Sequence, residues 1–454
     1  LDWHQADLWQ VLRRMIFVNG RLARIGGDSR VRYAYCQEYL LPSLTYAADQ
    51  LSEAHAAELI SAQLDLIEAE ASYNGDGSFY GRRLAPLFST NPYYYTRLEA
   101  DRACALGMLL LQAPLAENFD NCPLEHRTFE ASVAGHWCEP DHGAVLHRCK
   151  TRLASFAWRA YGLAQGMCQP PDDGHLAEWE GNLSGTVRFM GDDGAFTGGQ
   201  TARRRLVSHH IELFDGGFIT YGVIEEGTDI TVPEGWRGTV MARTQLVFAA
   251  LPDGHTVIGL HLCRAGNLRV FPVEVNGLRW CLPNDLYNDS RRTLETDQGE
   301  ITLHSPPDNN EVLALQSRWA SYENKVGIVG LYGADELSVH RAPQRRAGKW
   351  QSLHIEEICF VCQLGAASVE SNEIIIDVGW AALSGVKATQ TKNFAVDNCE
   401  AALLLPADCR GVRVTGMDGN SYVVVANFGD QLQALDTFGI TLSPGEACLL
   451  SFGH

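Results

Sequence analysis

The chain has 454 residues, of which 46% are hydrophobic, and a formal net charge of −19. This length exceeds what one hydrophobic core usually holds, so we expect two or three domains. Nucleic acid is disfavoured as a partner, because phosphate binding normally shows as a basic domain or stripe. No apolar run reaches the length of a membrane helix, so we expect neither a membrane span nor a membrane partner.

The N-terminus and the cysteines bear on location. Leu1 to His4 lack a charged segment followed by an apolar stretch, and the chain starts within a helical pattern, so any secretion signal is expected to have been removed. The 13 cysteines are scattered from Cys36 to Cys448 without the density of a disulfide scaffold, which favours a reducing, cytoplasmic location. The Cys-x-x-Cys at 359–362 has no second pair at zinc-site spacing, which favours buried thiols on a strand.

Helical periodicity dominates the first 180 residues. One stripe predicts an amphipathic helix over residues 3–18: Leu8, Val11, Leu12, Met15 and Ile16. Further helices are predicted over 34–49, interrupted by Pro42, and from Ser52 onward, with one apolar face: Ile60, Leu64, Ile67 and Ala71. Thr96-x-x-Glu99 resembles a capping box that opens a helix through Leu111.

A last helical stripe lies over residues 149–165: Leu153, Phe156, Ala157, Ala160, Tyr161 and Ala164. Successive helices joined by moderate loops pack as antiparallel hairpins, and hairpins can close into a toroid with an inner cleft. Residues 1–180 leave room for about three hairpins, fewer than a complete toroid needs. Either the toroid is incomplete, or an N-terminal portion lies outside this chain.

Beyond residue 180, short alternating strands separated by turn residues favour stacked antiparallel sheets over a parallel βαβ architecture. Turns are expected at four places: Asp215-Gly216-Gly217, Asp253-Gly254, Asn276-Gly277 and Asp418-Gly419. We therefore predict an α+β fold in which an α/α toroid-like helical domain (1–180) precedes an antiparallel β-sandwich domain (181–390) and a small C-terminal β-domain (391–454). Residues 386–392 would form the second boundary.

Arginine clusters in one predicted connection between helices, residues 20–33. The chain has 31 Arg and 5 Lys, and the Arg guanidinium is a planar fork that suits carboxylate or sulfate groups. Flexible glycines together with Arg24, Arg30 and Arg32 are what recognition of an anionic sugar requires. The glycine spacing matches no nucleotide-binding loop. The alternative is that these side chains cap helix ends and pair with Asp28 and Glu38.

Two further connections, residues 74–83 and 91–102, combine aromatic rings with Arg and carboxylates. This combination is typical of surfaces that stack on sugar faces and hydrogen-bond sugar hydroxyls. The candidate residues are Asp76, Tyr80, Arg83, Tyr94 and Arg97. The three adjacent tyrosines at 93–95 cannot all face inward, so some of them are expected to pack in the core or at a helix entry.

The fourth cluster is His136-Trp137-Cys138-Glu139-Pro140-Asp141-His142, followed by His147-Arg148. Histidine titrates near neutrality, so His142 can move a proton while Glu139 holds its tautomer, and Trp137 can stack on a sugar. Ordinary surface histidines are the alternative, and the spacing fits no defined metal site. Weaker candidates in the β region are Ser208-His209-His210 and Trp319 to Lys325, which would face the cleft if the sheets pack against it.

Helical hairpins with Arg-, Tyr- and His-bearing loops, followed by a long antiparallel β region, resemble the toroid-plus-sandwich polysaccharide lyases of the heparinase, chondroitin-lyase and alginate-lyase type. The resemblance implies β-elimination at a uronic acid, in which Arg or Asn neutralises the carboxylate and Tyr or His handles the proton. Here it implies Arg30, Arg32 or Arg97 for the carboxylate and Tyr80 with His142 for the proton. The Asn-Trp-Trp and Glu-Ile-Gly features of some relatives are absent, and the helical portion is short.

A glycoside hydrolase of the same architecture is the main rival, because it divides acid and base or nucleophile roles between two carboxylates. Asp76 and Glu139 are among the candidates for such a pair. The Arg-dense loops favour the lyase, since elimination needs cationic help at the substrate carboxylate. A noncatalytic glycan-binding protein is the third hypothesis. For the enzyme we expect an oligo- or polysaccharide substrate, no organic cofactor and no metal; the sugar, the linkage and the oligomeric state are left open.

Overall fold

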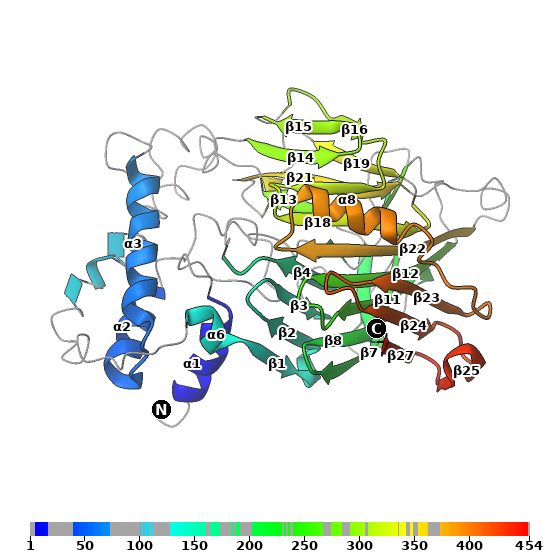
Figure 1. The fold of residues 1–454 in the computed structure, drawn as a ribbon, viewed down its shortest axis with the longest axis horizontal. Helices are drawn as coiled ribbons and strands as arrows, with labels where there is room; N and C mark the ends of the chain where they lie inside the picture. The colour runs from blue at the N-terminus through cyan, green and yellow to red at the C-terminus, as the bar shows by residue number, and fades with distance from the viewer. Residues whose placement is uncertain are drawn as a thin grey trace.

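A computed structural model of the chain describes residues 5–16, 40–72, 128–159, 164–172, 202–228, 239–266, 274–283, 291–304, 307–334, 336–341, 353–361 and 373–452, with short pieces between 100 and 111 and at 183–184, 188–190, 231–232, 235–236 and 346–347. A helical part ends at Val133 and a β-rich part begins at Gly135 (Figure 1). The strands therefore begin within the span that the sequence analysis assigned to helices.

Four helices of the N-terminal part are described with both ends: α1 (Gln5–Arg14), α2 (Leu40–Leu51), α3 (Ala56–Ser72) and α6 (Phe129–Val133). The short described pieces between 100 and 111 are also helical. The helices predicted over 3–18 and from Ser52 are confirmed, and α2 runs through Pro42, which lies in its first turn, where proline is tolerated. The four helices share one core of apolar side chains, among them Trp9, Leu41, Leu44, Leu59 and Phe129. The toroid stays a prediction, because these helices do not by themselves form a ring.

The first sheet is entirely antiparallel and follows the path β1-β2-β3-β4-β5-β13-β21-β19-β16. Its strands are β1 (Gly135–Glu139), β2 (Ala144–Arg148), β3 (Leu153–Ala157), β4 (Gln165–Gln169), β5 (Leu183–Ser184), β13 (Glu274–Pro283), β21 (Leu353–Val361), β19 (Glu336–Arg341) and β16 (Glu311–Ala314). Two short strands extend it, β6 (Arg188–Met190) beside β13 and β20 (Arg346–Ala347) beside β21.

The helix predicted over 149–165 is wrong. This stretch holds β3 and the start of β4, and every residue of β3 is buried. A strand that is buried on both faces shows no alternation of apolar and polar residues, so its apolar run can match a helical stripe by chance. The His136 to His142 segment also lies between two strands of the sheet, β1 and β2, and not between helices.

The second sheet packs on the first and follows the path β15-β14-β17-β18-β22-β12-β11-β8-β7. Its strands are β15 (Gly299–Leu303), β14 (Arg292–Thr296), β17 (Trp319–Tyr322), β18 (Val326–Tyr332), β22 (Glu373–Ser384), β12 (Thr256–Gly266), β11 (Thr239–Ala250), β8 (Gly217–Thr228) and β7 (Ala202–Phe214). A small separate hairpin pairs β9 (Thr231–Val232) with β10 (Gly235–Trp236). The antiparallel β-sandwich predicted from the sequence is confirmed in this coarse sense.

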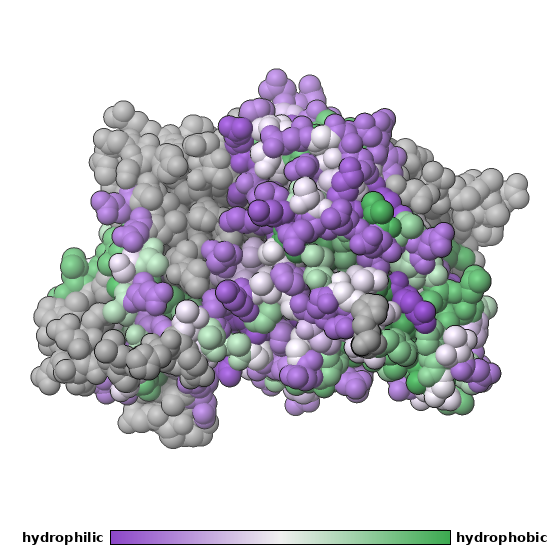
Figure 2. All heavy atoms as spheres, in the orientation of Figure 1, coloured by the Kyte–Doolittle hydropathy of each residue, from purple (hydrophilic) through white to green (hydrophobic). Residues whose placement is uncertain are grey.

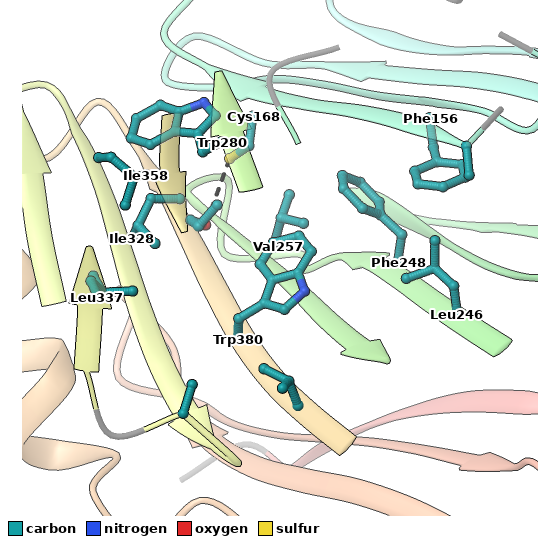
Figure 3. Close-up of a cluster of buried hydrophobic side chains, with 14 of the residues drawn as sticks. Phe156, Cys168, Leu246, Phe248, Val257, Trp280, Ile328, Leu337, Ile358 and Trp380 are labelled. Carbon is teal, nitrogen blue, oxygen red and sulfur yellow. Dashed lines mark hydrogen bonds between the residues drawn. The ribbon is translucent and has the colours of Figure 1, made fainter. Parts of the chain in front are cut away.

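The main core lies between the two sheets. Figure 3 shows Phe156 of the first sheet beside Phe248 of the second, while Trp280 of the first sheet contacts Tyr322 of the second with ring centroids 5.6 Å apart. The ring centroids of Phe156 and Phe248 lie 4.9 Å apart, and Trp380 is 1% exposed. Aromatic side chains bury large areas, so these contacts between strands distant in sequence hold the sheets face to face.

A C-terminal sheet covers the other face of the second sheet. It consists of β23 (Cys409–Thr415), β24 (Ser421–Asn427) and β27 (Ala447–Phe452), beside a hairpin of β25 (Gln433–Leu435) and β26 (Ile440–Leu442). Helix α8 (Ala388–Asp397) packs on the same face. This helix occupies most of residues 386–392, which the sequence analysis treated as a boundary. Figure 2 shows exposed hydrophobic residues gathered at the lower right, where the C-terminal strands lie.

Three of the four predicted turns are confirmed. Gly216 and Gly254 have positive φ in the β7–β8 and β11–β12 hairpins, and Gly419 has positive φ between β23 and β24. The predicted turn at Asn276-Gly277 is wrong, since both residues lie inside β13, where the register to β21 shifts between Asn276 and Arg279. Glycine inside a strand commonly marks such a bulge.

Candidate functional site

Only part of the predicted site falls within the described residues. Trp137, Glu139 and His142 are described, and all three belong to β1 or to the connection that follows it. The other predicted site residues lie outside the described residues: Arg24, Arg30, Arg32, Asp76, Tyr80, Arg83, Tyr94 and Arg97. Their grouping therefore stays a prediction, and the described geometry concerns the sheet side of the expected cleft.

The β1–β2 connection is a single turn of 3-10 helix, Pro140–His142, closed by Gly143. Gly143 has φ 66° and its backbone N–H donates to the Pro140 carbonyl at 3.0 Å, a left-handed ending that glycine adopts without strain. His209 of β7 approaches from the second sheet and its Nε2 lies 2.9 Å from the same carbonyl, so this nitrogen is the donor. The weaker candidate His209 thus contacts the predicted site, and the turn is held from both sides.

His142 and Glu139 form an exposed pair on this connection. The Nδ1 atom of His142 lies 3.7 Å from a carboxylate oxygen of Glu139, and the two side chains are 75% and 50% exposed. A carboxylate facing Nδ1 favours the tautomer that carries its proton there, which leaves Nε2 as the basic nitrogen. The pair can therefore accept a proton from a molecule that approaches from solvent.

Trp137 lies on the sheet face that meets the helices. Alternation along β1 places Trp137 and Glu139 on one face, with Leu146 of β2 opposite Trp137. Half-buried Trp137 and Met15, which follows α1, pack against a small buried cluster: Leu146, Leu153 and Met167. This contact belongs to the seam between helices and sheet, and a role of Trp137 in stacking on sugar stays a prediction.

Arg148 is fully buried at the seam, the contact between the helices and the first sheet. Its Nη1 donates to the backbone carbonyls of Arg14 and Ile16 at 2.9 and 2.5 Å, and its other nitrogens pair with the Glu130 carboxylate of α6. The guanidinium also lies 5.4 Å from the centroid of the Phe129 ring. One side chain of β2 thus joins the end of α1 and the start of α6, and the connection that carries Arg24, Arg30 and Arg32 leaves from this point.

Two histidines and an ion pair form a chain of contacts that starts on β1 and β2. His136 and His147, opposite each other on β1 and β2, have ring centroids 4.6 Å apart. Arg152 lies with Nη2 3.2 Å from Nδ1 of His147 and with Nη1 3.7 Å from the Asp253 carboxylate. Burial, then the charge of Arg152, then that of His136 lower the pKa of His147 to about 3.

In this chain of contacts the side chains of His147, Arg152 and Asp253 are buried, and that of His136 is half-buried. His147 accepts from Arg152 and is neutral at physiological pH, so it cannot serve as a cation for an anionic substrate. Sequence reasoning named His136, His147 and Arg148 but missed Arg152 and Asp253. Arg152 fell within a wrongly predicted helix, and Asp253 was interpreted as a turn residue. The one signal in the sequence that could have pointed to this pair is the charge of Arg152 beside the apolar run that follows it.

In the part of the chain that the structure describes, no three His, Cys, Asp or Glu side chains gather as metal ligands do. The described helices include none with the length and apolar character needed to cross a membrane.

No protein-family model matches the chain, and no curated protein matches it. Among solved structures, a xanthan lyase from Paenibacillus is similar at 9% identity and a TM-score of 0.45, over 93% of this chain and 39% of the lyase. The galactosidase domain of an α-galactosidase–sucrose kinase is similar at 7% identity and a TM-score of 0.33, over 58% of this chain and 44% of that domain. An α-galactosidase from Lactobacillus brevis is similar at 7% identity and a TM-score of 0.31, over 56% of this chain and 41% of the galactosidase. The chain spans less than half the length of each of these proteins.

Proposed function

We propose that the chain is a carbohydrate-active enzyme that cleaves uronic-acid-containing oligo- or polysaccharides by β-elimination. The observation that carries the proposal is the exposed His142, whose Nδ1 faces the Glu139 carboxylate at 3.7 Å on a turn fixed by Gly143 and His209. A positioned base with an orienting carboxylate is what abstraction of a carbon-bound proton requires.

In the proposed reaction, Nε2 of His142 takes the proton from C5 of the uronic acid. The electrons of the C5–H bond form the C4–C5 double bond, and the C4–O bond breaks with its electrons on the leaving oxygen. Tyr80 gives that oxygen a proton, and Arg30, Arg32 or Arg97 neutralises the uronate carboxylate, which makes C5 more acidic. Arg148 supports this assignment because it anchors Ile16 to the sheet, immediately before the connection that carries Arg30 and Arg32.

The test is incubation with a panel of uronic-acid polymers, following the ultraviolet absorbance of the unsaturated product and the appearance of reducing ends. His142→Ala is expected to lower kcat by about a hundredfold or more, the usual range for loss of a general base. Glu139→Gln should lower it less, since the base remains. His304→Ala is the matched control, because His304 is exposed and lies after β15. Full turnover by His142→Ala would refute the assignment.

Glycoside hydrolysis is the second candidate, and it rests on the carboxylates of the same connection. Glu139 and Asp141 are both exposed there and could divide acid and base roles. New reducing ends without the absorbance of an unsaturated product would favour hydrolysis over elimination. Binding without either signal on any glycan would favour the noncatalytic alternative.

A further inference from the structure

A cleft of about 470 Å³ lies between the second sheet and the C-terminal sheet, on the face of the second sheet opposite to the one that meets the β1–β2 connection. Its floor is the outer face of β8, β11 and β12, and its wall is formed by the loops at residues 428–430 and 444–445 together with Asp408, next to β23. These strands lie side by side at the lower right of Figure 1. Volumes of this size are typical of sites for small ligands.

The floor carries a row of charged side chains in which three arginines face one glutamate. Strand register places Arg205, Glu225, Arg243 and Arg264 opposite one another across four neighbouring strands, on one face. Glu225 pairs with Arg205 and lies 3.7 Å from Arg243, so one carboxylate serves two guanidinium groups. Among the described residues, no hydrogen bond or ion pair holds Arg264, which is exposed.

Arg243 and Arg264 are directly opposite each other on adjacent strands. Like charges in this arrangement destabilise a sheet, and the carboxylate nearest to Arg243 among the described ion pairs, that of Glu225, is shared with Arg205. An anion between them would convert the repulsion into two charge-assisted hydrogen bonds, and a carboxylate matches the planar guanidinium fork. The two side chains line the cleft, where such an anion can reach them.

The rest of the floor is polar and rigid. Gln245, 7% exposed, uses its side-chain NH2 group twice, toward the Tyr221 hydroxyl at 3.1 Å and the Phe428 carbonyl at 2.7 Å. Burial raises the pKa of Tyr221, so its hydroxyl keeps its proton, which remains available to donate to a ligand. The bond to Tyr221 joins β11 to β8 within the floor, and the bond to the Phe428 carbonyl ties the floor to the wall and fixes the width of the cleft at this point.

The wall supplies the opposite charge. Asp408 and Asp430 line it on either side of Gly429, and a Cβ at Gly429 would lie 2.7 Å from Cβ of Asp408, so the loop packs closely there. Carboxylates accept hydrogen bonds from hydroxyl groups and repel a ligand with several negative charges. The cleft is therefore complementary to a molecule with one carboxylate and several hydroxyls, and not to a polyphosphate.

We propose that this cleft is a noncatalytic binding site for a uronic acid residue of an acidic oligosaccharide. Arg243 and Arg264 hold its carboxylate, while Asp408 and Asp430 accept hydrogen bonds from its hydroxyls. The choice of sugar class rests on the proposed function. The site would keep a second segment of the polymer on the enzyme while another segment is cleaved.

The test measures binding by calorimetry to the full chain carrying His142→Ala, so that substrate is not consumed. Tetragalacturonate and tetramannuronate are the acidic probes, and cellotetraose is the neutral one. Arg264→Ala and Arg243→Ala are each expected to weaken binding of at least one acidic probe by about tenfold or more, as loss of a charged hydrogen bond does. Arg413→Ala is the matched control, an exposed arginine of β23 outside the cleft.

Hydrogen exchange localises the site, because the bound probe should protect amides of 239–250 and 426–446, and Arg264→Ala should abolish that protection. Equal affinity in Arg264→Ala and Arg413→Ala, or equal binding of cellotetraose, would overturn the proposal. The test of the cleft can fail or succeed independently of the test of the proposed lyase activity. Arginine-dependent protection without any unsaturated product would sustain the cleft and remove the lyase, whereas product formation with unchanged affinities would do the reverse.

Discussion

The guanidinium of Arg152 and the carboxylate of Asp253 lie 3.7 Å apart, and neither side chain is exposed to solvent. Arg152 Nη1 also donates to the carbonyls of Leu251 and Thr256, and its Nη2 to the carbonyl of Gly216. Asp253 accepts from the backbone of Thr256 at 2.8 Å and from that of Met417 at 3.1 Å. One pair therefore joins turns of both sheets to the C-terminal region.

Replacing Arg152 should strongly lower the stability of the fold, because it leaves the buried Asp253 carboxylate without a compensating positive charge. Arg152→Met is expected to lower the free energy of unfolding by about 3–5 kcal/mol. The free energy of unfolding of Arg152→Lys should lie between those of the parent protein and Arg152→Met, because an ammonium group keeps the charge but cannot reproduce the planar fork. Urea unfolding gives the comparison, and Arg159→Met, in the exposed turn after β3, is the control. Equal midpoints for the two Met variants would contradict the assigned role.

A histidine in the main core finds no hydrogen-bond partner among the residues that the structure describes. His261 of β12 is 1% exposed, and both of its ring nitrogens are buried without a partner among the described residues. Its ring centroid lies 6.2 Å from that of Trp380. Burial lowers the pKa of His261 from 6.5 to about 3. The unfolded chain therefore binds a proton between pH 6.5 and 3 that the folded chain does not, and stability falls as pH drops through this window.

His261→Leu is expected to raise the free energy of unfolding at pH 7 by about 1 kcal/mol or more, since it removes a buried unsatisfied group. The gap over the parent protein should widen as pH falls from 6.5, by up to about 1.4 kcal/mol per pH unit. Urea unfolding at several pH values measures both effects. Parallel pH profiles for parent and variant would show that His261 is not neutral in the fold.

Gly259 is required by the indole that lies against it. A Cβ at this position would lie 2.0 Å from Cε2 of Trp380, which is on the paired strand β22. Gly259→Ala should cost about 1–3 kcal/mol through overpacking. Gly107→Ala, in a helix with nothing within 4 Å of the added carbon, should instead stabilise slightly. Thermal unfolding distinguishes the two, and a combined Gly259→Ala, Trp380→Leu variant should recover part of the loss if the indole is the obstacle.

The sequence predicted elements well where one face is polar. Helix α1 and the hairpin turns at Gly216 and Gly254 were foreseen because amphipathic stripes and Asp-Gly steps are local signals. Strand β3 was mistaken for helix because both of its faces are buried. Helix α8 was missed because its buried residues are small or isolated, with Ala388, Thr391 and Phe394 forming no clear apolar stripe.

The candidate site divides in the same way. The exposed pair Glu139 and His142 could be named because the residues are near in sequence and their chemistry is local. The Arg152 to Asp253 pair joins positions 101 residues apart through a turn-to-turn contact, which no periodicity records. The row of Arg243 and Arg264 is likewise visible only once strand register is known.

Arg148 should stabilise the helical part more than it stabilises the sheets. It is the buried cation that holds the carbonyls of Arg14 and Ile16 and pairs with Glu130, so Arg148→Met leaves three acceptors unpaired at the seam. Each contact that it loses lies on the helical side, while the sandwich core is untouched. We therefore expect local opening of the helices at a small cost to the global unfolding of the sandwich.

Hydrogen exchange and limited proteolysis measure that opening. In Arg148→Met, amides of 5–16 should lose protection by about a hundredfold, equivalent to about 3 kcal/mol of a broken buried pair, while those of 409–427 keep theirs. Lys150→Met, at an exposed position two residues further on, should leave both segments unchanged. Because the proposed reaction needs loops from the helices beside His142, product formation should fall together with the protection of 5–16. Activity that survives complete loss of that protection would separate the helices from catalysis.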